Sequence, residues 1–324
     1  MYQSNVMNNS SCDLTFRKSE PLISLLKRPS VALSLLAVFV FAIYYGTLSF
    51  EFVWDDVPQI VNNPLIRDWS LSRVFFNDLW FHASRDQVYY RPLFVVWLIL
   101  NFKIFGLKAW GWHLGSVLLH ILASCTVFCL ARVLKLEYPT ALLAAILFGL
   151  HPMHIECAAW ISAGSDSMVT IFFVLAFSAF LKSHEPKTHR RRFLIASYLL
   201  FICALLVKEM AVTFSVMVLI YECVMSRDVA NQIVRVRRAT IAAAPYIALT
   251  IGYLLLRRLA VHRTWQFDPY YSNLNAALTI PVVLFSYLRL LTFPKGLTGL
   301  YFIPYVTNPG FWNFVFPSFT LIAA

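Results

Sequence analysis

The sequence predicts an all-α polytopic membrane protein built as one helical bundle. Hydrophobic residues make up 59% of the 324 residues and charged residues only 13%, and the mean hydropathy is +0.66. A typical soluble chain carries about twice that share of charged residues. Apolar segments long enough to cross or nearly cross a bilayer, which takes roughly 20 residues, recur along the whole chain. These segments leave no stretch for a separate water-soluble domain.

The first apolar segment, 31–50, follows a polar stretch that we expect to form a cytoplasmic tail over residues 1–30. It is too long for a signal-peptide core and predicts a retained signal anchor. Later segments that are shorter than a full span are expected to pack among their neighbours. The further segments are 113–131, 139–160, 167–182, 193–207, 210–226, 239–256, 275–293 and 309–324. We expect one membrane domain over 31–324, truncated within its last apolar run.

The net charge of +11 raises the question of nucleic-acid binding, which the distribution of the charges argues against. The basic residues lie in short patches at every second loop, as the positive-inside rule describes. This pattern predicts a cytoplasmic amino terminus and an external or lumenal loop after 31–50. The patches are Arg17, Lys18, Lys27 and Arg28; Arg132 and Lys135; Lys187 and Arg190 to Arg192; and Arg227, Arg235, Arg237 and Arg238.

The apolar stretch 91–107 is expected to lie along the outer interface instead of crossing the membrane. If it crossed, the loop containing Arg190 to Arg192 would face outward, against the charge pattern. The stretch is therefore predicted to be an interfacial helix within one large external loop, residues 51–112. We expect that helix to form one wall of a lipid groove.

Most ionisable residues near membrane depth fall on the predicted outer face, which indicates a shared cavity there. Such residues cost several kcal/mol unless they are paired or functional. These residues are Asp55, Asp56, Arg91, His113, His151, His154, Glu156, Asp166, Lys208, Glu209, Arg257, Arg258 and Arg263.

Each candidate also has an ordinary structural interpretation. Asp55-Asp56 could be a solvated loop start or a helix cap. Lys208-Glu209 could be a self-neutralised pair in a tight turn. His151 and His154 with Glu156 could in principle ligate a metal, but Pro152 and the lack of a third His or Cys nearby favour a helix-end hydrogen-bond cluster, and we predict no metal.

Several short motifs, in order along residues 50 to about 305, carry a family resemblance. The motifs are Val53-Trp54-Asp55-Asp56, Tyr90-Arg91-Pro92-Leu93, Gly111-Trp112-His113, Leu118-Leu119-His120, His151-Pro152-Met153-His154-Ile155-Glu156, Ile161 to Asp166, Lys208-Glu209-Met210-Ala211-Val212-Thr213 and Phe293-Pro294. With these motifs the chain resembles the dolichyl-phosphate-mannose protein O-mannosyltransferases of the GT-C superfamily, especially those with tetratricopeptide repeats, and their bacterial relatives.

The resemblance implies a GT-C-like helical bundle and a sugar-transfer activity. The sugar, expected to be mannose, would pass from a polyprenyl or dolichyl phosphate to a hydroxyl of a protein or glycan. Asp55 is the expected base, with Asp56 orienting the acceptor or holding Asp55, or with these roles exchanged. Arg91, Lys208 and Arg257 are expected to bind the phosphate, with His151, His154, Glu156 and Glu209 beside them and Asp166 and His113 in support. Glu156 is expected to fix one imidazole tautomer, the histidines to donate hydrogen bonds, and Asp166 to anchor a basic residue. No cofactor is required.

The sequence departs from the family at two places. Ala163-Gly164-Ser165-Asp166 lacks the basic residue that usually precedes the aspartate, and Leu300 replaces an acidic residue before Tyr301. A transporter or flippase would instead show two related halves with polar groups reaching both faces. A catalytically inactive membrane scaffold is the other alternative. The expected location is the bacterial inner membrane or the endoplasmic reticulum, with the site on the periplasmic or lumenal side.

Overall fold

The computed structural model describes residues 28–76, 79, 89–186, 188–225, 231–261 and 273–323. Over these residues the chain is helical or irregular and contains no strand, which confirms the predicted fold class. Arg17, Lys18, Lys27, Lys187 and Arg227 of the predicted basic patches, and Arg263 of the predicted outer face, lie outside the described residues.

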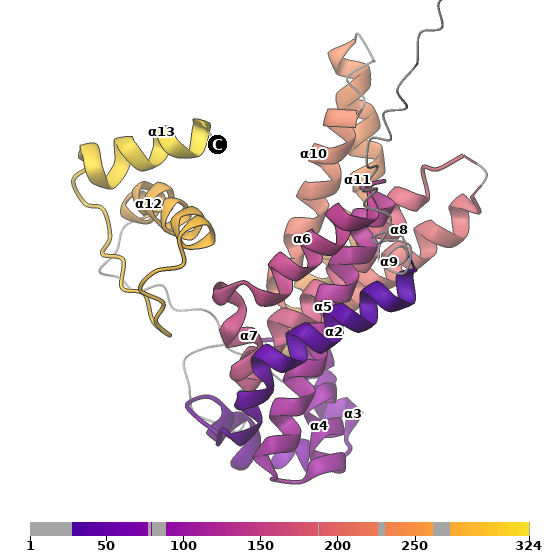
Figure 1. The fold of residues 1–324 in the computed structure, drawn as a ribbon. Coiled ribbons are helices and arrows are strands. Elements are labelled where there is room, and N and C mark those ends of the chain that lie inside the picture. Colours follow the sequence, from indigo (N-terminus) through magenta and orange to yellow (C-terminus); the bar gives the residue numbers. More distant parts are fainter. Residues whose placement is uncertain are drawn as a thin grey trace, which may run out of the picture.

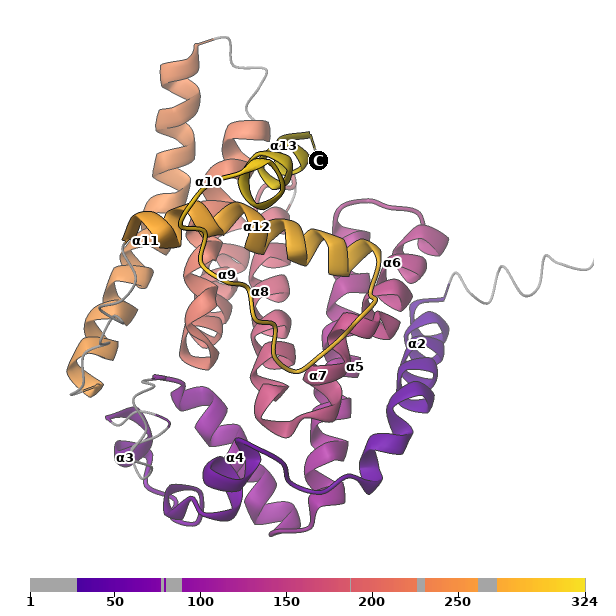
Figure 2. The same ribbon diagram turned by 90° about the vertical axis from the view of Figure 1, so that its left-hand side faces the viewer.

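A bundle of long helices forms the body of the molecule (Figures 1 and 2). Helix α8 packs against α5 and α9, α5 packs against α2 and α6, and α10 packs against α11. The bounds are α2 (Pro29–Tyr44), α5 (Ala109–Val133), α6 (Tyr138–Leu150), α8 (Gly164–Lys182), α9 (Arg190–Val207), α10 (Thr213–Met225) and α11 (Gln232–Ala260).

Two apolar clusters hold this bundle together. The larger is rich in aromatic rings, and Phe201, Phe214 and Tyr246 join α9, α10 and α11 with ring centroids 4.8 to 5.6 Å apart. The smaller joins α2, α5 and α6 through residues such as Leu36 and Ala145. Close aromatic packing of this kind adds to the burial of apolar area and fixes the helices against one another.

The apolar segment predicted at 139–160 is broken in the structure. Helix α6 ends at Leu150, and the short helices η4 (Pro152–His154) and α7 (Ile155–Ala159) continue at an angle of 50°. His151 adopts an extended conformation, because a residue before proline is disfavoured in the helical region and Pro152 has no N–H to donate. The break directs the motif from His151 to Glu156 away from the axis of α6.

The predicted external loop folds into short elements at one end of the bundle (Figure 2). Helix α4 (Pro92–Phe105) has 14 residues, about 21 Å of helix, which is too short to span a bilayer. It contacts α5 and α9, and Phe94 and Leu98 are fully buried. The other elements of the loop are η2 (Val57–Val61), η3 (Pro64–Ile66) and α3 (Leu71–Phe75). Outside it, η1 (Tyr45–Ser49) follows α2 and η5 (Ile161–Ala163) lies between α7 and α8.

Helices α12 (Asn273–Thr292) and α13 (Phe316–Ala323), with η7 (Phe311–Val315), lie beside the bundle (Figure 1). The end of α12 and the segment that follows it contact the motifs identified above. The Leu291 carbonyl lies 2.9 Å from His151 Nε2, and Gly299 lies directly against the Trp54 ring.

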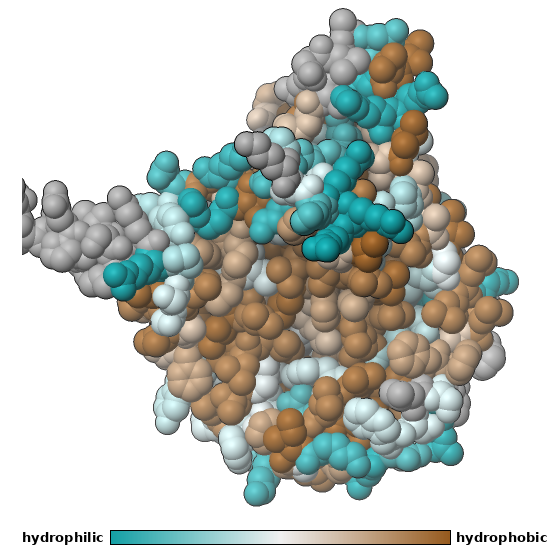
Figure 3. All heavy atoms as spheres, turned by 90° about the vertical axis from the view of Figure 1, so that its right-hand side faces the viewer, coloured by the Kyte–Doolittle hydropathy of each residue, from teal (hydrophilic) through white to brown (hydrophobic). Residues whose placement is uncertain are grey.

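Among the described residues, five helices are long and apolar enough to cross a membrane, or six if α6 and α7 form one bent span. This is fewer than the nine apolar segments of the sequence, because α9 begins with three arginines and α10 and α13 are short. Figure 3 shows a broad hydrophobic band between two hydrophilic ends, as expected for a bundle that sits in a bilayer.

Candidate active site

The loop after η1 carries the adjacent acids. Trp54 has φ of 48°, a left-handed conformation that is uncommon for a large side chain. Its ring lies against Trp160, with centroids 5.9 Å apart, and against Gly299, where a Cβ atom would come within 3.0 Å of the ring. A strained residue supported on two sides fixes the direction in which the chain enters Asp55 and Asp56.

Asp56 is fully buried and binds a segment 106 residues away. Its Oδ1 accepts hydrogen bonds from the Ser162 backbone N–H at 2.9 Å and from the Ser162 hydroxyl at 2.6 Å, and its Oδ2 accepts one from Val53 N–H at 3.3 Å. Burial raises the pKa of Asp56 despite these hydrogen bonds, and neighbouring Asp55 raises it further. Asp56 thus ties the acidic loop to the start of α8.

Asp55 has a different environment from its neighbour. Its side chain is half-buried, and its backbone carbonyl accepts a hydrogen bond from Gln59 N–H at 2.9 Å in the turn that leads into η2. Two adjacent carboxylates in different environments can take different roles, one structural and one facing solvent.

Arg91 and Glu209 form a two-point ion pair between the start of α4 and η6 (Glu209–Val212). Arg91 Nη2 lies 2.7 Å from Glu209 Oε1 and Nε lies 3.1 Å from Oε2, and the guanidinium stacks on Tyr89 at 4.3 Å. Burial opposes ionisation of Glu209, but the hydrogen bonds and charge of Arg91 outweigh it, so the pKa of Glu209 lies below its usual value.

Lys208 pairs with Asp166 and not with its neighbour in sequence. Its Nζ lies 2.5 Å from Asp166 Oδ1, so the interpretation of Lys208-Glu209 as a self-neutralised pair is wrong. Lys208 has extended backbone angles, φ −156° and ψ 135°, and successive side chains of an extended chain point to opposite sides. Lys208 therefore reaches α8 while Glu209 reaches Arg91, and Asp166 has the basic partner expected for it.

The histidines of the α6–α7 break bond to backbone atoms. His154 Nδ1 lies 2.7 Å from the Phe148 carbonyl, and His151 Nε2 lies 2.9 Å from the Leu291 carbonyl while its Nδ1 accepts from Met153 N–H. This is the predicted helix-end hydrogen-bond cluster. The expectation that Glu156 fixes an imidazole tautomer is wrong, because these backbone atoms fix the tautomers. The imidazole N–H groups that were expected to donate to a ligand already donate to backbone carbonyls.

The remaining candidates surround this end of the bundle. Glu156 is exposed on α7 and is electrostatically coupled to Asp166. Arg257 lies one turn after Tyr253 on α11, and Tyr253, whose hydroxyl donates to the Tyr90 carbonyl at 3.3 Å, is within electrostatic range of Arg91, Glu209 and Arg257. The hydrogen bond from Tyr253 to the Tyr90 carbonyl therefore holds α11 close to Arg91, the next residue in the chain.

His113 is 1% exposed on α5 and supports the acidic loop. Its ring meets Phe50 edge to face at 6.0 Å and lies near the backbone of Glu51 and Ala159. Neither ring nitrogen makes a well-formed hydrogen bond to the part of the chain that the structure describes. The side chain acts through packing on the loop that leads to Asp55.

A cavity of about 360 Å³ opens beside these residues. Its lining is mostly apolar and includes His154 and Asp166, the partner of Lys208. The lining residues are His120, Phe148, His154, Cys157, Asp166, Ser167, Val169, Thr170, Phe173, Val174, Met210 and Thr213. None of them belongs to α4, since the walls of this cavity are made by α5 to α8, η6 and α10, and the role of α4 as one wall of a lipid groove stays a prediction.

Sequence reasoning did not single out Ser162, Tyr253 or Thr213. Ser162 lies within the quoted stretch from Ile161 to Asp166, four residues before Asp166. Its place in that stretch was the only sequence signal that it belongs to the site. Nothing local indicated that it would bind Asp56.

The described residues include no group of three His, Cys, Asp or Glu side chains placed to hold a metal ion.

Comparison with known proteins gives matches over this same region. A family described as dolichyl-phosphate-mannose-protein mannosyltransferase matches residues 90–256, which is more than half of the chain and includes Arg91, His154, Asp166 and Lys208. No solved structure matches the chain significantly.

Three relatives illustrate the similarity. The mouse protein O-mannosyl-transferase TMTC1 is 34% identical over 209 residues, 60% of this chain. The human protein O-mannosyl-transferase TMTC2 is 30% identical over 188 residues, 56% of this chain, and the Caenorhabditis elegans protein O-mannosyl-transferase F38B6.6 is 30% identical over 149 residues, 44% of this chain. The matched regions cover 22% of the length of each relative.

Proposed function

We propose that this multi-pass membrane chain, which belongs to the dolichyl-phosphate-mannose-protein mannosyltransferase family, carries the catalytic membrane region of a glycosyltransferase. It moves mannose from a polyprenyl or dolichyl phosphate to a hydroxyl of a protein. The supporting observation is that two ion pairs, Arg91–Glu209 and Lys208–Asp166, are joined through the adjacent residues Lys208 and Glu209, and that Asp166 lines a mostly apolar cavity.

The proposed reaction uses one carboxylate as base. The acceptor O–H proton passes to Asp55 as the acceptor oxygen attacks the anomeric carbon, and the bond from that carbon to the phosphate oxygen breaks. The phosphate takes the bonding electrons and leaves without needing strong protonation, so a second carboxyl group acting as acid is unnecessary. Asp56 holds the loop, because its oxygens already accept three hydrogen bonds.

Lys208, Arg91 and Arg257 are proposed to stabilise charge on the departing phosphate. An ammonium has three N–H donors and a guanidinium five, so Lys208 and Arg91 keep donors beyond those used on Asp166 and Glu209. Charge-assisted hydrogen bonds in a partly dehydrated site are roughly twice as strong as neutral ones. The paired carboxylates hold these cations in place.

The cavity between α8 and α10 suits the lipid part of the donor. It presents Phe148, Val169 and Phe173 to a hydrocarbon chain, and Asp166 is the one acidic residue of its lining. His154, whose Nδ1–H donates to Phe148, has its Nε2 lone pair to accept a hydrogen bond from a sugar hydroxyl. We place this end of the bundle on the lumenal or periplasmic side, because the basic loops lie at the other end.

Replacement of Asp55 tests the base. Asp55→Asn is expected to lower mannosyl transfer by at least 100-fold, in line with the effect of general-base removal, while leaving the protein inserted. The assay incubates membranes containing the chain with radiolabelled dolichyl-phosphate mannose and measures labelled protein. Asp68→Asn is the control, since Asp68 is an exposed acid of the same loop. Full activity in Asp55→Asn contradicts the base assignment, and no transfer by the unaltered chain contradicts the proposed function.

Replacement of Lys208 tests the phosphate contact separately. Lys208→Ala is expected to weaken binding of a dolichyl-phosphate sugar about tenfold, the loss expected for one charge-assisted hydrogen bond. Binding is measured on purified protein by competition with a labelled donor. Lys103→Ala, which removes an exposed lysine of α4, is the matched control. Unchanged binding in Lys208→Ala removes this residue from the donor site.

A further inference from the structure

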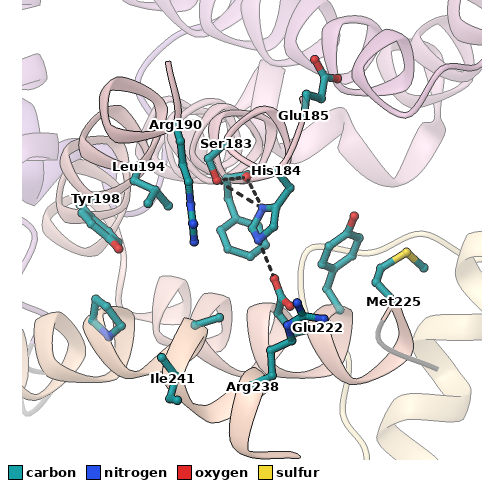
Figure 4. Close-up of a pocket in the computed structure, with 14 residues that line it drawn as sticks. Ser183, His184, Glu185, Arg190, Leu194, Tyr198, Glu222, Met225, Arg238 and Ile241 are labelled. Atoms are coloured by element: carbon teal, nitrogen blue, oxygen red, sulfur yellow. Dashed lines mark hydrogen bonds and ion pairs between the residues drawn. The ribbon is translucent and has the colours of Figure 1, made fainter. Parts of the chain in front are cut away.

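A second cavity, of about 640 Å³, opens at the other end of the bundle. It lies between the α8–α9 turn and the facing helices α10 and α11 (Figure 4). None of the candidate residues of the active site lines it. Its walls are Phe180, Ser183, His184, Glu185, Arg190, Leu194, Tyr198, Tyr221, Glu222, Met225, Arg238, Ile241, Ala242 and Pro245.

Two arginines point into this cavity from opposite walls, Arg190 from α9 and Arg238 from α11 (Figure 4). Between them, His184 Nε2 lies 2.9 Å from Glu222 Oε1. The Glu222 side chain is only 8% exposed, and a buried carboxylate needs nearby cations. Glu185 points away from the other labelled residues (Figure 4). The charged side chains that point inward are therefore the two arginines and Glu222, two cations and one carboxylate.

The position of the cavity along the bundle indicates where a ligand comes from. Helix α9 runs 18 residues from Arg190 at this cavity to Val207, next to Lys208 of the active site. At 1.5 Å per residue that is about 27 Å, close to the roughly 30 Å thickness of the hydrocarbon core. The two sites therefore lie near opposite surfaces of the membrane, each at the depth of the lipid headgroups.

The rest of the lining is aromatic and aliphatic, including Leu194, Tyr198 and Tyr221. A ligand that fits both parts carries an anionic group and an apolar body. The planar guanidinium of arginine binds phosphate oxygens in two-point fashion, and two arginines on facing walls can hold one phosphate between them. We propose that this cavity binds a phosphate ester, with the phosphate between Arg190 and Arg238.

A binding experiment on the full chain tests this proposal. The protein is purified in a neutral detergent and titrated, in native mass spectrometry, with phosphatidic acid, with diacylglycerol of the same acyl chains, and with inorganic phosphate. Arg190→Gln and Arg238→Gln are each expected to weaken phosphatidic acid binding about tenfold. Arg191→Gln and Arg237→Gln, exposed neighbours that do not line the cavity, are the controls. Glu222→Gln is expected to strengthen binding, since it removes a negative charge from the wall.

The arms separate the two sources of phosphate. Binding of phosphatidic acid that inorganic phosphate does not displace assigns the site to a lipid headgroup, and equal binding of inorganic phosphate assigns it to a soluble phosphate. Either result supports the phosphate site if the lining arginines matter more than the controls. Equal binding of diacylglycerol, equal losses in all four arginine variants, or weaker binding in Glu222→Gln overturns it. The result is independent of mannosyl transfer.

Discussion

At the scale of single residues, the two adjacent acids differ in environment, because Asp56 is buried and Asp55 is half-buried. Asp56 is enclosed and accepts hydrogen bonds from both the backbone and the hydroxyl of Ser162. The contact crosses 106 residues of sequence and holds the loop of Asp55 against the start of α8. The sequence predicted a functional pair of acids and left their roles exchangeable. The hydrogen bonds show that Asp56 anchors the loop, and the catalytic role of Asp55 stays a prediction.

Ser162→Ala is expected to destabilise the protein by about 1 to 3 kcal/mol, because it removes one donor from a buried carboxylate. It should also reduce transfer, since the loop of Asp55 loses its anchor. Unfolding of the purified protein in mixed detergent measures the free energy. Ser116→Ala is the matched control, because the Ser116 hydroxyl is also buried but has no hydrogen-bond partner in the described chain. Equal losses in the two variants would contradict the anchoring role of Ser162.

At the scale of elements, the close approach of α6 to its neighbours depends on Gly149. A Cβ atom at this position would lie 2.7 Å from Val40 Cγ2 on α2 and 2.8 Å from Ser124 Oγ on α5. The Gly149 carbonyl also accepts a hydrogen bond from His120 Nε2 at 3.0 Å. These contacts fix the end of α6 immediately before the His151-Pro152 break.

Gly149→Ala is therefore expected to lower the free energy of unfolding by about 1 to 3 kcal/mol, the usual cost of overpacking. Gly252→Ala on α11 is the control, since no atom lies within 4 Å of a Cβ there and alanine favours a helix. The same unfolding measurement applies to both. A stable Gly149→Ala protein combined with a destabilised Gly252→Ala protein would reverse the expected order and contradict this description of the α2–α5–α6 contact.

The elements also show which expectations could be read from sequence. Long apolar runs predicted α2, α5, α8, α11 and α12, because apolar length alone identifies a spanning helix. The helix at 91–107 was predicted to lie along the interface, and the structure forms a 14-residue helix there. Its burial against α5 and α9 was not foreseen, since an apolar helix looks the same in sequence whether it meets lipid or protein. The break at Pro152 was visible as a proline, while its 50° angle depends on tertiary packing.

At the scale of the whole molecule, the contacts that build the site join distant parts of the chain. Arg91 meets Glu209 across 118 residues, and Asp166 meets Lys208 across 42. Motif order and charge pattern could predict that these residues belong to one end of the bundle. They could not predict the partners, because neighbouring charges such as Lys208 and Glu209 give no sign in sequence of facing different helices.

The pH dependence of stability follows from two carboxyl groups with opposite shifts. The pKa of Asp56 is raised above 3.8, so its contribution is present below about pH 3.8 and is lost as the pH rises through the folded pKa. The pKa of Glu209 is lowered below 4.5, so its contribution is present above about pH 4.5 and is lost as the pH falls through the folded pKa. The two groups therefore act in opposite directions in weak acid.

Variants separate these contributions. Relative to the unaltered protein, Asp56→Asn is expected to gain stability as the pH rises above about 3.8. Burial opposes ionisation of the Asp56 carboxyl, and asparagine does not ionise, so only the unaltered protein loses stability. Glu209→Gln is expected to lose stability above about pH 4.5 and to approach the unaltered protein below it, because protonation removes the charge that Arg91 binds. Thermal unfolding followed by circular dichroism over a pH series measures both, with exposed Glu137→Gln as the control for removing one carboxylate. Slopes of the same sign in the two variants would show that the Arg91–Glu209 pair and the burial of Asp56 do not control acid stability as the structure requires.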